Sequence, residues 1–191
     1  MSSVVSPAST DEALEMLTAA MGYLAAADTT AMTAEEQARC LRVLEHVTST
    51  GTAARTSVLG AFAHGQGPGA DAEYSPRAWL IHKTGVTKGA AVSYTAWVRR
   101  AEEHPVVFTA MAVGDLPESV ARIVCQWTNR LPEDQRDAAD DKLVAAVAAA
   151  HSGVRSPDST PAPWKVVISR TARSSNVSSL SWSGDADRDC S

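Results

Sequence analysis

The chain has 191 residues, 45% of them hydrophobic, and 22 acidic against 17 basic residues give a formal net charge of −5 at pH 7. This size allows a buried core in one domain with appendages, and the negative charge argues against nonspecific polyanion binding by the whole molecule. No charge-free apolar run approaches the roughly 20 residues that a membrane-spanning helix needs, so we expect no membrane partner.

Helix signals begin near the N-terminus. Leucine and methionine side chains recur on one stripe from Thr10 and Asp11 to about Asp28, which predicts a first helix. Thr33 and Glu36 have the spacing of a capping box and predict the start of a long second helix. That helix has a weak point at 48–52, where β-branched residues surround a glycine. Glycine and proline in the stretch 64–74 then predict a connecting loop.

The central segment 75–101 reads as two helices joined by a tight turn. Ser75 is a suitable N-cap, and Pro76 follows at the first helical position, where a missing amide does no harm. Gly85 ends this helix and Thr87 caps the next one. The pattern therefore predicts a helix-turn-helix-like pair.

Helical patterns continue to residue 151. Pro105 opens a short helix that ends at Gly114, and Asp115 with Glu118 forms a second capping-box pattern. Pro132 starts the final predicted helix, whose interior is rich in alanine.

The fold class predicted is therefore all-α, a multi-helix bundle with a helix-turn-helix-like pair and a disordered C-terminal tail. The helical domain spans 10–151. The tail, 152–191, is rich in serine and charge, and only the apolar cluster 164–168 could form a short strand.

Charge is distributed unevenly along the chain. Residues 75–101 hold five Lys or Arg and no Asp or Glu, whereas residues 1–74 and 102–151 are both acidic. Because physiological salt screens exposed charges beyond about 8 Å, a phosphate beside the central pair would respond mainly to these five cations. The spacing by four, three and four residues places one row on a single face of the second helix, opposite its apolar face, and this row is Lys88, Val92, Thr95 and Arg99.

This geometry predicts local binding of double-stranded DNA. In helix-turn-helix proteins the second helix enters the major groove and the first crosses the phosphate backbone. The alternative is that these cations only complement helix dipoles or are solvated without a partner. The predicted nucleic-acid-binding residues are Arg77, His82, Lys83, Thr87, Lys88, Val92, Arg99 and Arg100.

No pattern in the chain predicts catalysis, a metal or a cofactor. The histidines lack metal-binding spacing, and we expect surface or capping roles for all five, which are His46, His64, His82, His104 and His151. Three cysteines lie far apart, which favours neither a disulfide framework nor a zinc site. The tryptophans 79, 97 and 127 lie on apolar helix faces and are expected to pack in the core. The first basic residue is Arg39, so the positively charged start of a secretory signal is missing and we predict a cytoplasmic protein.

The stretch YSPRAWLIHKTGVTKGAAVSYTAWVRRAEEHPVVFTAMAVGDLPESVARIV carries a family resemblance. It resembles the all-helical domain of unknown function at the N-terminus of actinobacterial HNH endonuclease proteins, including the 13E12 repeat family. The resemblance covers roughly 11–151, and its features include Trp79, the Thr84-Gly85 pair and the DLPESVARIV helix start.

The resemblance implies a targeting module of a nuclease-type protein from a mobile or repeated element. The HNH module itself, with its histidine base and metal ligands, is absent, because no histidine follows His151. We therefore expect a DNA-binding module that is not an enzyme, with a tail that is truncated or frameshifted. The alternative is a structural or homo-oligomerising helical domain, or a nonfunctional remnant.

Overall fold

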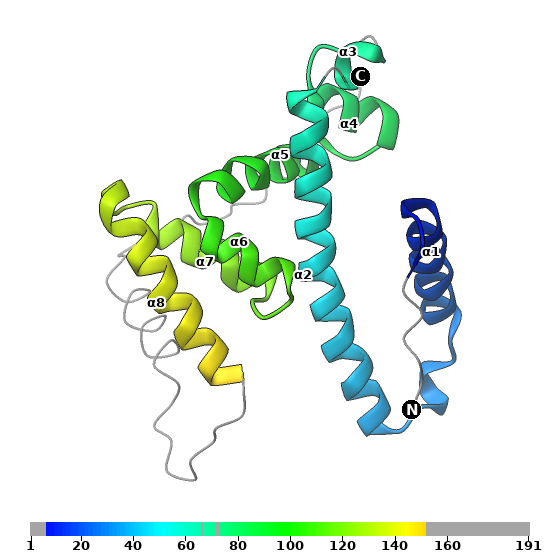
Figure 1. Ribbon diagram of the computed structural model, residues 1–191. Coiled ribbons are helices and arrows are strands. Elements are labelled where there is room, and N and C mark those ends of the chain that lie inside the picture. Colours follow the sequence, from blue (N-terminus) through cyan, green and yellow to red (C-terminus); the bar gives the residue numbers. More distant parts are fainter. Residues whose placement is uncertain (1–6, 66, 72, 152–191) are drawn as a thin grey trace, which may run out of the picture. The chain divides into compact units, whose positions relative to one another are not determined.

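All regular secondary structure in the described part of the chain is helical, which confirms the all-α prediction (Figure 1). The computed structural model describes residues 7–65, 67–71 and 73–151, so the predicted strand at 164–168 lies outside it. The elements are α1 (Thr10–Ala26), the 3-10 helix η1 (Thr29–Ala31), α2 (Ala34–His64), α3 (Gly67–Ala70), α4 (Pro76–Thr84), α5 (Lys88–Glu103), α6 (Pro105–Ala112), α7 (Glu118–Thr128) and α8 (Glu133–His151).

The chain divides into two compact units, Met1–Glu45 and His46–Ser191. The division falls within α2, which continues without a break through the predicted weak point at 48–52. None of the described helices combines the length and the apolar character that crossing a bilayer requires.

Local capping explains the helix starts of the first unit. The Ser9 hydroxyl accepts the Glu12 amide at 3.1 Å, so Ser9 rather than Thr10 is the N-cap of α1. The predicted capping box at the start of α2 is confirmed: the Thr33 amide donates to Glu36 Oε2 at 2.8 Å, and the Glu36 amide donates back to Thr33 Oγ1 at 3.3 Å. These hydrogen bonds from Thr33 lower the pKa of the Glu36 carboxyl.

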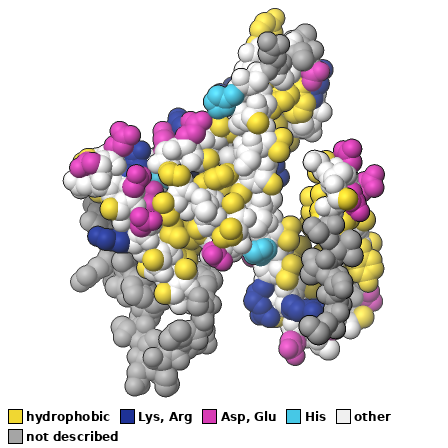
Figure 2. All heavy atoms as spheres, viewed as in Figure 1, with side chains coloured by type: hydrophobic (Ala, Val, Ile, Leu, Met, Phe, Trp, Pro, Cys, Tyr) yellow, Lys and Arg dark blue, Asp and Glu magenta, His cyan; other side chains and the backbone are white. Residues whose placement is uncertain are grey.

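The core of the second unit surrounds the apolar helix α6. Val107 and Met111 of α6 are fully buried, and they belong to one cluster with Trp97 of α5, Val124 of α7 and Val147 of α8. Figure 2 shows hydrophobic side chains over α6. The core prediction is thus confirmed for Trp97, whereas tryptophans 79 and 127 are only half-buried.

Helix α7 starts differently from the sequence prediction. Asp115 and Glu118 do not form a capping box, because α7 begins at Glu118 with Pro117 at the N-cap position and no side-chain cap from that residue. The buried Ser49 hydroxyl on α2 instead accepts the Glu118 amide at 3.0 Å. A cap that is 69 residues away replaces the local one.

A second apolar cluster holds the central helix pair. Leu59 of α2, Leu80 of α4 and Ala91 of α5 are its buried members. The predicted loop before α4 also contains one helical turn, α3, so that part of the loop prediction was wrong. Glycine allows helical backbone geometry, and Pro68 sits in the first turn, where proline is tolerated.

The turn between α4 and α5 depends on Gly85. This residue has φ = 70°, in the left-handed region, and its amide donates to the Ile81 carbonyl at 3.2 Å. Ser75 and Thr87 cap α4 and α5 as predicted, each hydroxyl accepting an amide at 3.2 Å. The helix, tight turn, helix pattern of 75–101 is therefore confirmed.

Gly85→Ala should destabilise the protein by about 1 kcal/mol, because an alanine side chain disfavours this backbone conformation. A Cβ added at Gly85 would meet no atom within 4 Å, so the loss is conformational rather than steric. Gly89→Ala, inside α5 and equally open, is the matched control and should stabilise by about 0.5 kcal/mol. Urea unfolding followed by circular dichroism measures both, and equal effects of the two changes would contradict this assignment.

Candidate nucleic-acid interface

Helices α4 and α5 position seven of the eight predicted residues, and Thr87 lies in the turn between them. Arg77, Lys83, Lys88 and Arg99 are exposed, and 40% of Val92 is accessible to solvent. On the opposite side of α5, Trp97 is buried and packs in the core. The amphipathic pattern therefore turns the predicted face of α5 outward.

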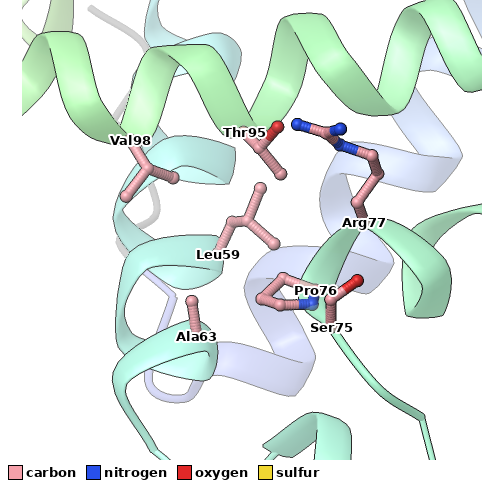
Figure 3. Close-up of a pocket in the computed structure, with 7 residues that line it drawn as sticks. All are labelled: Leu59, Ala63, Ser75, Pro76, Arg77, Thr95 and Val98. Carbon is pink, nitrogen blue, oxygen red and sulfur yellow. The ribbon is translucent and has the colours of Figure 1, made fainter.

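A groove between α2, α4 and α5 brings Arg77 to this face (Figure 3). Its volume is about 400 Å³, and Leu59 and Val98 contribute apolar walls. Figure 3 shows the guanidinium of Arg77 extending from α4 toward the Thr95 hydroxyl of α5. Thr95 lies between Val92 and Arg99 in the row of residues predicted to face outward on α5. The cation of Arg77 on α4 therefore approaches the middle of that row.

The other three predicted residues have partners of their own. The Thr87 hydroxyl caps α5, and His82 Nδ1 lies 3.0 Å from Glu73 Oε1. Arg100 is half-buried, with its guanidinium carbon 5.2 Å from the centre of the Trp97 ring. Its charge also acts on the buried Cys125 thiol, so Arg100 lies toward the core.

Arg99 is an intermediate case. Its Nε lies 3.6 Å from Glu103 Oε1, one turn later on α5, but 69% of the Arg99 side chain remains accessible. An exposed ion pair of this kind contributes less than about 1 kcal/mol, so a phosphate can compete for the guanidinium. Arg77, Lys83 and Lys88 have no ion-pair partner among the residues that the structure describes.

We call the exposed residues of the predicted interface the basic face, which consists of Arg77, Lys83, Lys88, Val92 and Arg99. Its location contrasts with the acidic remainder of the second unit, where Figure 2 shows Asp and Glu side chains gathered over the first turns of α8. The sequence did not identify Thr95 as a neighbour of Arg77, because that proximity arises only when α4 packs on α5.

A buried polar network, which the sequence did not reveal, lies apart from the basic face. The His104 side chain is fully buried, so a surface or purely capping role for it was wrong. Its Nδ1 lies 2.8 Å from Asp140 Oδ2, and its Nε2 lies 3.0 Å from Asn129 Oδ1. The network joins the end of α5 to α7 and α8. One signal was available: Asp140 falls on the same stripe of α8 as the buried Val147.

The network offers no reactive group to solvent. Burial raises the pKa of the nearby Cys125 thiol to about 12, and the charge of Asp140 contributes to this rise, so the thiol is protonated at neutral pH. Within the described ranges, no group of three or more His, Cys, Asp or Glu side chains is arranged to hold a metal ion.

Comparisons of the chain with protein families, curated proteins and solved structures find no match.

Proposed function

We propose that the chain binds double-stranded DNA through the basic face, as a cytoplasmic targeting module without catalysis of its own. The observation that carries this proposal is the outward display of four cations by two adjoining helices, with Arg77 of α4 beside the α5 row. On this proposal the chain is related to the helical domains that accompany HNH endonucleases.

Each part of the basic face has a distinct role in such a complex. Lys88 and Val92 lie in the first turns of α5, the region of a recognition helix that reaches base edges in the major groove. The phosphates on either side of the major groove are contacted by Arg77, Lys83 and Arg99, and these contacts fix the register of the protein on the duplex. The positive end of the α5 dipole adds to the attraction for a phosphate near Lys88.

Reversing Lys88 and Arg99 to Glu should weaken duplex binding by roughly 100-fold, since each contact to a charged group is worth about 1.5 kcal/mol or more. Fluorescence anisotropy with a labelled duplex at fixed salt measures the change. Both side chains are exposed, so the folded structure should survive, and circular dichroism checks this.

The matched control is the double reversal of Arg130 and Lys142 to Glu. Both residues are exposed outside the basic face, and the change in net charge is identical. If the two double variants lost affinity equally, attraction by the total charge would explain the binding and the basic face would not.

A further inference from the structure

The groove between α2, α4 and α5 has the composition of a small-molecule site (Figure 3). Four of the residues that line it are apolar, and these are Leu59, Ala63, Pro76 and Val98. Its volume of about 400 Å³ lies near the lower end of the range of ligand pockets, which is about 300–1,000 Å³. A ligand with a single ring or a short branched chain therefore matches its size.

The polar side chains of the groove favour an anion. Arg77 is the one charged residue among the described residues that line it, and no carboxylate of the described chain pairs with it. Ser75 Oγ accepts the Ala78 amide at 3.2 Å, and its own proton has no acceptor within the described part of the chain. The Arg77 guanidinium and the Ser75 hydroxyl can therefore both donate to a carboxylate, which only accepts.

A DNA duplex does not fill this groove. A phosphate on Arg77 brings no apolar group with it, so the apolar walls of the groove, such as Leu59 and Val98, would stay uncovered. A small organic acid satisfies both requirements, because its carboxylate pairs with the guanidinium and its hydrophobic body removes these walls from water.

We propose that the groove binds a small organic carboxylate with a hydrophobic body. The carboxylate lies at Arg77 and Ser75, and the body lies against Leu59 and Val98. Because Arg77 also belongs to the basic face, this ligand and a DNA phosphate compete for one guanidinium. The ligand is then an antagonist of duplex binding, a regulatory role that rests on the proposed function, whereas the site itself does not.

Two-dimensional ¹H–¹⁵N NMR of the full chain with 4-phenylbutyrate tests the site without DNA. The amide shifts of Ser75, Arg77, Thr95 and Val98 should saturate with a Kd of about 1 mM, as expected for a ligand of this size. 4-Phenyl-1-butanol lacks the charge and acetate lacks the hydrophobic body, so each should bind at least about tenfold more weakly. Equal binding of 4-phenyl-1-butanol, or no saturable shift in the groove, overturns the proposal.

Two variants locate the probe. Ala63→Leu places a larger side chain in the groove and keeps Arg77, so 4-phenylbutyrate should bind at least about tenfold more weakly. Ala61→Leu, exposed on the same helix and outside the groove, is the matched control and should bind like the wild type. Arg77→Gln should weaken binding of the carboxylate by about tenfold and leave that of 4-phenyl-1-butanol unchanged. Unchanged probe binding by Ala63→Leu and Arg77→Gln would place the probe elsewhere and refute the site.

Fluorescence anisotropy with a labelled duplex tests the competition. About 10 mM 4-phenylbutyrate, compared with acetate at the same concentration, should weaken duplex binding by the wild type roughly fivefold and by Ala63→Leu not at all. If the wild type binds both probe and duplex with no mutual effect, competition for Arg77 is wrong. If it binds the probe but no duplex, the proposed function fails and the NMR result still supports the groove site.

Discussion

Asp140→Ala is expected to destabilise the second unit by about 3 kcal/mol, because removing one partner of a buried hydrogen bond leaves the other polar group buried and unsatisfied. Asp140 is 1% exposed and lies 2.8 Å from His104 Nδ1, which is itself fully buried. Without the carboxylate, this ring nitrogen keeps only a long contact of 3.4 Å to the Thr128 hydroxyl. A large share of the stability of a domain this size would be lost.

Urea unfolding monitored by circular dichroism measures the effect. Asp141→Ala removes the neighbouring carboxylate of α8, which is exposed, and should change the free energy of unfolding by less than about 0.5 kcal/mol. Equal destabilisation by the two substitutions would show that the His104 pair does not hold α8 to the rest of the unit.

Trp97→Ala should also destabilise the second unit by about 3–5 kcal/mol, as expected for truncation of a buried aromatic side chain. Trp97 is 2% exposed within the main core cluster, and its Nε1 donates to Glu118 Oε1 at 2.9 Å. The substitution therefore leaves a cavity between α5 and α7 and removes a hydrogen bond that spans 21 residues.

Val92→Ala provides the control on the same helix, because Val92 is 40% exposed and lies on the outward side. Its effect on the unfolding free energy should stay within about 0.5 kcal/mol. A small effect of Trp97→Ala, close to that of Val92→Ala, would contradict the assignment of the packed and outward faces of α5.

Helix limits were predictable wherever the cap lies next to the helix in sequence. Ser75, Pro76, Gly85 and Thr87 carry the hydrogen-bonding and backbone preferences that bound α4 and α5, and the structure places each in that role. Such signals act over three or four residues, so one sequence is sufficient to read them.

Features that depend on distant residues could not be read in this way. The α7 cap comes from Ser49, and the partner of His104 is 36 residues further along the chain. Helical periodicity alone can place Asp140 and Val147 on one stripe of α8, but it does not indicate which residue faces Asp140. Tertiary packing supplies these contacts, and a local pattern does not encode them.

The basic face was only partly predictable for the same reason. Helical spacing was sufficient to place Lys88, Val92 and Arg99 on one side of α5. It could not reveal that Arg100 turns toward Trp97, or that Arg77 approaches Thr95 from another helix.

The most direct test of the central claim is the salt dependence of duplex binding, measured by fluorescence anisotropy. If Arg77, Lys83 and Arg99 contact phosphates, the logarithm of the association constant should fall with the logarithm of salt concentration, with a slope of about −2.7 per bound chain. The variant with Lys88 and Arg99 reversed to Glu loses one of these phosphate contacts and should have a slope shallower by about 1. Identical slopes for the wild-type and variant proteins, or no binding at low salt, would contradict DNA recognition by α4 and α5.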